Sequence, residues 1–316
     1  MSKPNLIRAA DPSAIQEAAK ILKGGGLVGL PTETVYGLAA NAADDKAVAR
    51  LYAAKGRPSF NPLISHVFSA AAAWEIAAPT PLARKLADAF WPGPLTLVLA
   101  RRVDAQISDL ACAGLDTIAI RVPSHPTAQT LLTEFGGPIV APSANPSGQL
   151  SPTTAAHVAS GLGDKIDLIL DGGPCEAGLE STVVDAQGDG PVLLRPGALP
   201  RGDMEAIVGS LKTPVSSAGD TPTSPGMLLK HYAPDAALRI NAETPRAGEA
   251  FLAFGSTTIE TPYNLSPAGD LVEAAANLFA MLRDLDARYN QIAVARIPSE
   301  GLGEAINDRL TRAAER

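Results

Sequence analysis

The chain has 316 residues, of which 46% are hydrophobic and 4% aromatic, and its 26 Lys and Arg against 33 Asp and Glu give a formal net charge of −7. This apolar fraction excludes a disordered chain, and the length is typical of two domains that bury a sizeable core. No apolar run reaches the roughly 20 residues of a membrane-spanning helix, and no signal-peptide stretch precedes Asp11, so we expect a cytoplasmic protein.

Taken in chain order, the first two thirds alternate between helical and extended patterns. A helix begins after Asp11, a suitable N-cap, with Pro12 in its first turn, and Gly24 to Gly26 end it. Strands are expected near 27–30, 62–68, 95–100, 117–122, 138–141, 168–170, 182–184 and 192–194, and helices near 44–54, 82–90, 127–135 and 154–160. Because helices separate only some of these strands, we expect a mixed α/β sheet with a sizeable antiparallel portion.

The pattern changes over residues 213–235. Four prolines and two glycines occur there without helical or strand periodicity, which predicts a linker. Beyond it, strands are expected near 238–241, 251–254 and 292–297, and helices near 269–289 and 304–316. The chain is therefore expected to consist of a domain at 1–212, a linker at 213–235 and a small α/β domain at 236–316.

Charge and cysteine content narrow the class of function. Residues 1–212 hold 17 basic and 20 acidic side chains, and residues 213–316 hold 9 and 13, so neither part has the basic excess of a nucleic-acid-binding domain. The two cysteines, Cys112 and Cys175, have no Cys-x-x-Cys partner, which excludes a disulfide framework and a cysteine-rich zinc site.

Several familiar site motifs are absent from the sequence. There is no phosphate-binding G-x-x-x-x-G-K-[ST], no dinucleotide-binding G-x-G-x-x-G, no hydrolase G-x-S-x-G and no zinc-protease H-E-x-x-H. The histidines show no metal-ligand spacing, and a lone His66 within an apolar strand is by default a structural residue. These observations leave the familiar nucleotide-hydrolase, dehydrogenase and protease classes unsupported.

Two polar clusters stand at rigid turns. Lys55 and Arg57 emerge from a helix end into a Pro- and Gly-containing turn, where they could bind one anion together or simply be surface charges that stabilise the helix terminus. Ser143 and Asn145 lie between prolines after a short apolar strand, where they could form an anion cradle or merely close a turn with their own side chains. Each cluster alone leaves both interpretations open.

The combination of motifs, however, resembles one family over nearly the whole chain. PTETVYGL, KGRPSFNPL, SHV, WPGPLTLVL, IAIRVP, APSANPSG, ESTVVD and LLRPG follow one another in the order seen in the YrdC-type L-threonylcarbamoyladenylate synthases. SPGMLLKHYAP and a C-terminal α/β unit are similar to the long, two-domain form of that family. The pairs Lys55 with Arg57 and Ser143 with Asn145 both stand intact.

This resemblance implies an activity and a fold. Members of the family condense L-threonine, bicarbonate and ATP into threonylcarbamoyl-AMP and pyrophosphate, the first stage of threonylcarbamoyladenosine formation in tRNA. The implied fold is a twisted mixed sheet with a concave, positively lined cavity, followed by a small Rossmann-like C-terminal domain. Mg²⁺ is expected to be held mainly by ATP rather than by a protein site, and the threonylcarbamoyl-transferring machinery and tRNA are the implied further partners.

The resemblance also implies the site residues. Lys55 and Arg57 would neutralise the triphosphate and the developing pyrophosphate as catalytic groups. The nucleotide site would comprise Arg57, Asn61, Thr117, Ser143, Asn145, Ser151, Arg195 and Tyr232. The threonine site would comprise Thr32, Thr34, His66, Arg121, Ala141 and Ser181, with Arg121 pairing with the carboxylate. Tyr232, in the linker, would reach over the nucleotide and exclude water from the product.

Two other functions compete with this interpretation. An RNA-binding module could use a positively lined sheet, but the net charge of −7 and the threonine-shaped pocket disfavour it. A related carbamoylating enzyme carries a YrdC-like domain within a longer hydrogenase-maturation protein, but that form needs zinc sites that two isolated cysteines cannot supply.

Overall fold

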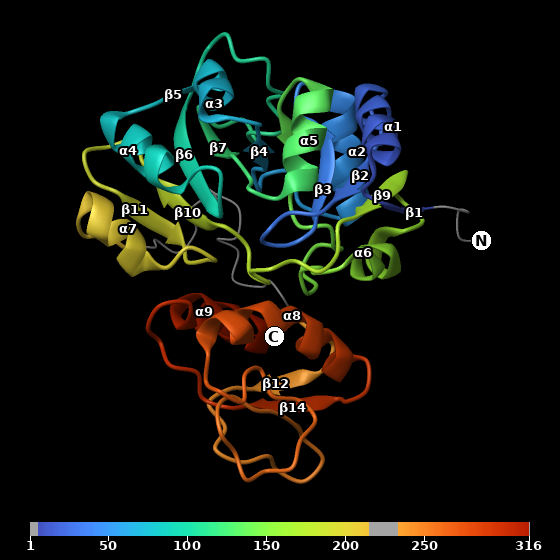
Figure 1. The fold of residues 1–316 in the computed structure, drawn as a ribbon, viewed down its shortest axis with the longest axis vertical. Coiled ribbons are helices and arrows are strands. Elements are labelled where there is room, and N and C mark those ends of the chain that lie inside the picture. Colours follow the sequence, from blue (N-terminus) through green and yellow to red (C-terminus); the bar gives the residue numbers. More distant parts are fainter. Residues whose placement is uncertain (1–5, 215–232, 316) are drawn as a thin grey trace.

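The computed structural model describes residues 6–214, called here the N-terminal unit, and residues 233–315, called the C-terminal unit. The two units lie one above the other in Figure 1, with a large sheet in the first and a small sheet in the second. Residues 215–232, which hold most of the expected linker and the expected nucleotide ligand Tyr232, lie outside the described residues.

The large sheet of the N-terminal unit mixes parallel and antiparallel neighbours. Its strands are β1 (Ile7–Ala9), β2 (Val28–Leu30), β3 (Gly37–Asn41), β4 (Ile64–His66), β5 (Ala77–Ala78), β6 (Leu95–Arg101), β7 (Thr117–Arg121), β8 (Ile139–Val140), β9 (Leu168–Asp171), β10 (Thr182–Asp185) and β11 (Val192–Arg195). They follow the order β1-β9-β2-β3-β8-β4-β7-β6-β10-β11, and β5 pairs with β6. The pairs β4/β7 and β6/β10 are parallel, whereas β6/β7 and β10/β11 are antiparallel, so the expected mixed sheet is confirmed.

Helices cover this sheet. They are α1 (Pro12–Lys23), α2 (Asp45–Lys55), α3 (Ala70–Ile76), α4 (Pro81–Phe90), α5 (Pro126–Phe135), α6 (Ala155–Leu162) and α7 (Arg201–Val208). The expected start of the first helix is confirmed, because the Asp11 carboxylate accepts a 2.9 Å hydrogen bond from the Ala14 amide and Pro12 opens the helix. α1 packs beside α5, and α4 beside α7.

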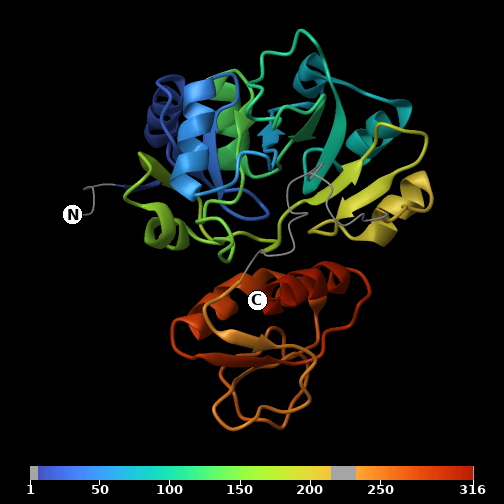
Figure 2. The same cartoon turned by 180° about the vertical axis from the view of Figure 1, so that it is seen from behind.

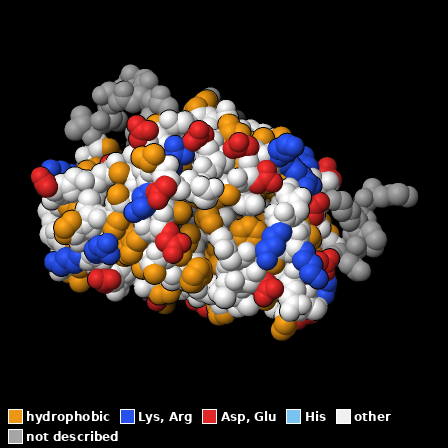
Figure 3. Space-filling model, turned by 90° about the horizontal axis from the view of Figure 1, so that it is seen from above, with side chains coloured by type: hydrophobic (Ala, Val, Ile, Leu, Met, Phe, Trp, Pro, Cys, Tyr) orange, Lys and Arg blue, Asp and Glu red, His pale blue; other side chains and the backbone are white. Residues whose placement is uncertain are grey.

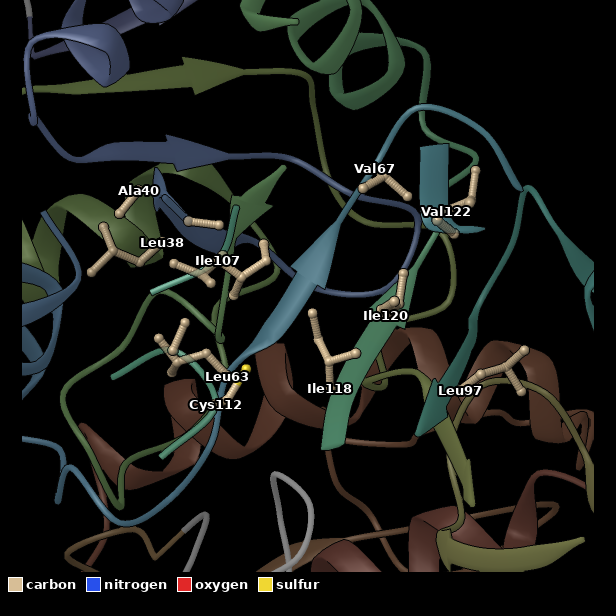
Figure 4. Packing of buried hydrophobic residues seen from close by; sticks show 14 of the residues in the cluster. Leu38, Ala40, Leu63, Val67, Leu97, Ile107, Cys112, Ile118, Ile120 and Val122 are labelled. Carbon is tan, nitrogen blue, oxygen red and sulfur yellow. The ribbon is translucent and has the colours of Figure 1, made fainter. Parts of the chain in front are cut away.

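The core of the N-terminal unit is built by alternate residues of its central strands. Figure 4 shows Ile118, Ile120 and Val122 on one side of β7 and its continuation, with Leu63 and Cys112 close together. Burial raises the pKa of the Cys112 thiol, so this cysteine packs as a small neutral apolar group. None of the described helices is both long enough and apolar enough to cross a bilayer.

The C-terminal unit is a small α/β layer that is docked through its helices. The strands β12 (Ala237–Arg239), β14 (Gln291–Val294) and β13 (Ala250–Leu252) form a parallel sheet in that order. Figures 1 and 2 show α8 (Leu271–Asp286) and α9 (Gly303–Ala314) between this sheet and the N-terminal unit. The expected small Rossmann-like unit after the larger sheet is therefore confirmed.

The contact between the two units combines apolar packing with arginine pairs. Val35, Leu150 and Leu179 of the N-terminal unit are buried in the hydrophobic cluster that α8 and α9 build. Arg201 binds the carboxylate of Glu304 through Nε and Nη2, at 3.1 Å from Oε2 and 2.6 Å from Oε1 respectively. The C-terminal unit is thus attached as a packed layer of the molecule.

Several elements differ from the expected pattern. The structure contains β1, β3, β5, α3 and α7, which the sequence pattern does not predict. β3 has the sequence GLAAN, whose Gly and Ala residues have low strand propensity, and it is extended because it pairs with β2 and β8. α7 has no side-chain N-cap and buries only Met204, so its periodicity is weak.

Candidate active site

A cavity opens where the carboxyl ends of β4 and β7 meet the first residues of β6 and β10. It contains about 500 Å³ of space, part of which is open to solvent. The lining residues are Thr34, Val35, Arg57, Leu63, Ile64, His66, Arg121, Ala141, Pro142, Ser143, Glu180, Ser181 and Arg195. Sheet topology explains the meeting point, because the register places His66 beside Arg121 and Arg121 beside Thr96 across three neighbouring strands.

Arg121, at the end of β7, is buried and held on three sides. Its Nε donates to the Gly93 carbonyl at 3.2 Å, and its Nη1 donates to the Thr34 hydroxyl at 2.8 Å. Its Nη2 lies 2.6 Å from Oε1 of Glu33. Burial alone would raise the pKa of the Glu33 carboxyl, but the charge and hydrogen bonding of Arg121 outweigh burial and lower that pKa. Because a guanidinium carries five N–H groups, this fixed arginine can still donate to a ligand carboxylate.

A chain of hydroxyl groups leads to Arg121. The Thr32 hydroxyl donates to the Val35 carbonyl at 2.6 Å, and its oxygen lies 2.8 Å from the Thr34 hydroxyl oxygen. Because the one proton of Thr32 is used by a carbonyl, Thr34 must donate to Thr32 while it accepts from Arg121. The Thr34 hydroxyl is therefore fixed at the cavity wall with a lone pair available.

His66 is buried at the end of β4 and is held neutral. Burial, followed by the charge of Arg121, lowers its pKa to about 3. Its Nδ1 lies 3.1 Å from the Ile64 carbonyl, which can only accept, so the proton of the neutral ring is on Nδ1 and Nε2 is an acceptor. At neutral pH this residue can accept a hydrogen bond from a ligand, but it is too weakly basic to hold a proton.

Lys55 joins the two polar clusters identified in the sequence. Its buried ammonium donates to the carbonyl oxygens of Ser143 and, at 2.5 Å, Asn145. Burial and the neighbouring charge of Arg57 set the pKa of Lys55 well below its usual range. The Ser147 amide donates back to the Lys55 carbonyl at 2.8 Å. The end of α2 and the 143–147 loop are therefore one assembly.

A second arginine lines the cavity from β11, in the same row of strand partners as Arg121. Arg195 ends β11 and donates through Nη2 to the Ser181 carbonyl at 2.8 Å and to the Ser181 hydroxyl at 3.2 Å. The Ser181 hydroxyl oxygen also lies 2.7 Å from that of Thr96. The antiparallel pairing of β10 with β11 brings the end of one strand to the start of the other, which places Arg195 and Ser181 side by side.

Glu180 is a cavity residue that the sequence analysis missed. Its carboxylate accepts hydrogen bonds from the Ser151 hydroxyl and, at 2.8 Å, from Nε of Arg309 in α9. Burial would raise its pKa, but the charges of Arg309 and Arg195 and the Ser151 hydrogen bond outweigh burial and lower the pKa to about 2. The sequence could have indicated Glu180, because it immediately precedes the expected site residue Ser181 in ESTVVD. Glu33 could have been found in the same way, because it lies between the expected site residues Thr32 and Thr34.

The residues expected at the site divide into two groups. Among the described residues, those that line the cavity are Arg57, Ser143, Arg195, Thr34, His66, Arg121, Ala141 and Ser181. Those outside the lining are Thr32, Lys55, Asn61, Thr117, Asn145 and Ser151. Thr32, Lys55 and Ser151 each bond to a lining residue, whereas Thr117 lies at the far end of β7 from Arg121. Tyr232 falls outside the described residues.

The donor set of this cavity fits anions better than a metal ion. Within residues 6–214 and 233–315, no group of three or more His, Cys, Asp or Glu is arranged to hold a metal. The carboxylates Glu33 and Glu180 each already pair with an arginine. The described lining residues include three arginines and one carboxylate, so their electrostatic field favours phosphate and carboxylate groups.

Comparison with known families and relatives covers most of the chain. Residues 20–197 match a family described as "Telomere recombination", and residues 200–315 match one described as "Threonylcarbamoyl-AMP synthase, C-terminal domain". A threonylcarbamoyl-AMP synthase of Bacillus subtilis is 42% identical over 96% of this chain and 93% of its own length. One from Pyrococcus abyssi is 40% identical over 95% of this chain and 94% of its own.

A solved structure gives the same result in three dimensions. The crystal structure of P. abyssi Sua5 complexed with L-threonine is similar to this chain with a TM-score of 0.89 and 39% identity. The alignment covers 98% of this chain and 96% of that one, so both units and their arrangement are shared.

Proposed function

The chain belongs to the threonylcarbamoyl-AMP synthase family, and we propose that it condenses L-threonine, bicarbonate and ATP into threonylcarbamoyl-AMP and pyrophosphate, the first step of threonylcarbamoyladenosine formation in tRNA. One observation carries the proposal. A single cavity is lined both by residues assigned to the nucleotide, such as Arg57 and Arg195, and by residues assigned to threonine, such as Arg121 and Ser181.

The threonine half of the cavity is the wall around Arg121. This guanidinium, held by Thr34 and Glu33, would bind the carboxylate of the amino acid. The neutral His66 would accept a hydrogen bond from the amine through Nε2, which orients the nitrogen lone pair toward bicarbonate. The ammonium group first loses its extra proton to solvent, and attack of the neutral amine on the bicarbonate carbon, with loss of water, then gives the N-carboxylated amino acid.

The nucleotide half is the wall around Arg57, Ser143 and Arg195. A carboxylate oxygen of the carbamate would attack the α-phosphorus of ATP and displace pyrophosphate, so several anions meet in one space. Arg57 and Arg195 would offset their repulsion, and Lys55 would keep the 143–147 loop in position through its bonds to the Ser143 and Asn145 carbonyls. The part of the chain that the structure describes supplies no carboxylate cage, and Mg²⁺ would enter on the triphosphate.

The surface of the N-terminal unit bears on the alternative that the protein only binds RNA. The face of the N-terminal unit that points away from the C-terminal unit shows basic and acidic side chains interspersed with apolar ones (Figure 3). Such a surface lacks the single-sign field that attracts a nucleic-acid backbone. An RNA-binding module is therefore the weaker proposal.

Pyrophosphate release tests the proposed function. Purified protein is incubated with ATP and Mg²⁺, and L-threonine and bicarbonate are omitted in turn. We expect release only when both are present, together with an adenylate product that contains the threonyl group. Release that ignores both co-substrates, or RNA binding without any turnover, would contradict the proposal.

A further inference from the structure

The largest fully buried side chain among the described residues is an arginine of the C-terminal unit. Arg309 lies in α9 with 0% of its surface exposed. Its Nε donates to Oε2 of Glu180 at 2.8 Å and its Nη2 to the Pro196 carbonyl at 3.0 Å, while its Nη1 lies 2.5 Å from Oδ2 of Asp308. One guanidinium therefore connects α9 to two segments of the N-terminal unit.

Both segments carry cavity residues next to the point of contact. Glu180 lines the cavity and precedes Ser181, and Pro196 directly follows Arg195. The two segments are closely packed, because a Cβ added at Gly197 would lie 2.4 Å from the Glu180 carbonyl oxygen. Because the packing is close, a displacement of Arg309 would also displace Ser181 and Arg195.

The charge of Glu180 is the reason such a contact matters. A carboxylate in the wall of an anion site repels the triphosphate unless a cation compensates it. Arg195 lines the cavity, where its charge would bind substrate anions. Arg309 is outside the lining and bonds to Glu180 from there. The compensated carboxylate can then hold the Ser151 hydroxyl without weakening the field of the cavity.

We infer that Arg309 is a positioning residue for the nucleotide half of the cavity, through which the C-terminal unit neutralises Glu180 and fixes the Glu180–Ser151 and Arg195–Ser181 pairs. The inference rests on the proposed function in that it takes ATP as the anion. It means that the C-terminal unit increases the affinity for ATP although it does not contact the nucleotide.

Arg309→Met tests this inference, because the substitution keeps much of the side-chain volume and removes the charge. Arg201→Met is the matched control, since Arg201 also forms an ion pair across the contact between units but does not line the cavity. ATP affinity is measured by calorimetry with a non-hydrolysable ATP analogue and Mg²⁺, and by the KM for ATP. We expect Arg309→Met to weaken ATP binding about tenfold or more, and Arg201→Met to leave it within about twofold.

A second variant separates charge from packing. Removal of Arg309 leaves Glu180 as a buried carboxylate without its ion pair. The double variant Arg309→Met with Glu180→Gln removes both charges, and the new amide oxygen can still accept a hydrogen bond from Ser151. We expect the double variant to recover ATP affinity to within about threefold of the parent. If Arg309→Met alone fails to fold, the double variant still decides. A folded double variant with tight ATP binding supports the inference, and one that binds as poorly as the single variant, or does not fold, overturns it.

The pH dependence of binding gives a readout that a purely structural role would not move. With Arg309 absent, the largest charge that lowers the pKa of Glu180 is lost, so that pKa rises from about 2, the carboxylate is protonated at a higher pH than in the parent, and ATP affinity recovers as pH falls through that pKa. The parent and Arg201→Met should lack this added inflection. An Arg309→Met profile parallel to the parent would overturn the inference.

The two proposals fail in different ways. If the parent binds the ATP analogue but releases no pyrophosphate with L-threonine and bicarbonate, the proposed function fails while the Arg309 comparison remains measurable. If the parent is active and Arg309→Met has unchanged ATP affinity, only the role of Arg309 fails.

Discussion

At the scale of single residues, the cavity relies on groups whose protonation is fixed by their surroundings. Burial outweighs every other influence on His66 and lowers its pKa to about 3, and the adjacent arginines outweigh burial for Glu33 and Glu180. The site therefore keeps one neutral acceptor and paired carboxylates over the whole neutral range. Its pH dependence near neutrality should come from substrates rather than from these side chains.

His66 should make the folded protein sensitive to acid. Its pKa is lower in the folded chain than the usual 6.5 of the unfolded chain, so the unfolded state takes up the proton first and stability falls as pH drops below 6.5 toward 3. Between pH 6.5 and 5 this group alone should cost about 2 kcal/mol of unfolding free energy. Urea unfolding at both pH values checks this, and His66→Asn should show a smaller loss by about that amount. Equal losses in both proteins would contradict it.

Under the proposed function, we expect single side chains to decide discrimination between amino acids as well. Valine has no hydroxyl, so the polar groups of Thr34 and Ser181 would lose their partner on the substrate side chain, whereas Arg121 would keep the carboxylate; valine should therefore be rejected strongly. Serine keeps the hydroxyl and lacks one methyl, which is worth only about 1–3 kcal/mol. Competition assays of kcat/KM should show serine turned over at a reduced rate and valine hardly at all. Equal rejection of the two would argue against a hydroxyl-reading pocket.

At the scale of elements, the site depends on how closely α8 approaches the N-terminal unit. Gly178 has φ +67°, and a Cβ there would lie 2.4 Å from the Ala275 carbonyl oxygen of α8. Arg283 of α8 in turn donates to the Leu150 carbonyl at 2.7 Å, next to Ser151. The docking of this helix is thus set by a backbone contact that only glycine allows.

Gly178→Ala should therefore separate α8 from the loop. The strained φ and the clash with α8 together should lower the unfolding free energy by about 2 kcal/mol or more. Gly188→Ala is the matched control, because nothing lies within 4 Å of its added Cβ. Thermal unfolding of the two variants provides the comparison. An equal melting temperature for both variants would show that α8 can move away from residue 178 without a loss of unfolding free energy.

The sequence predicted regular elements well where the pattern was strong. The α1 cap at Asp11, the strands β6 and β7 and the helices α8 and α9 were all expected, since their periodicity is long or their capping residues are clear. β3 could not be predicted, because its Gly and Ala residues are extended only through pairing with strands elsewhere in the chain. Motif resemblance supplied the lining residues Arg121 and Ser181, whereas Arg309 stands in no motif and meets Glu180 only through the fold.

At the scale of the whole molecule, the C-terminal unit completes a hydrophobic core and bonds to the cavity residue Glu180 from outside the lining. A chain that ends at residue 212 would expose Val35, Leu150 and Leu179 and would lack Arg309. We expect such a truncation to bind a hydrophobic dye, to self-associate in size-exclusion chromatography and to bind ATP about tenfold more weakly or worse. A monomeric truncation with the parent's ATP affinity would contradict this view of the C-terminal unit.

The order of the strands in the large sheet also determines at what stage of synthesis the N-terminal unit can fold. β9 (Leu168–Asp171) lies between β1 and β2, which are synthesised far earlier, and β10 pairs with β6 across more than eighty residues of sequence. During translation, the first two strands therefore have no complete neighbour until most of the N-terminal unit has left the ribosome. Such high contact order slows folding and leaves the edges of β1 and β2 exposed in the nascent chain until β9 has been synthesised.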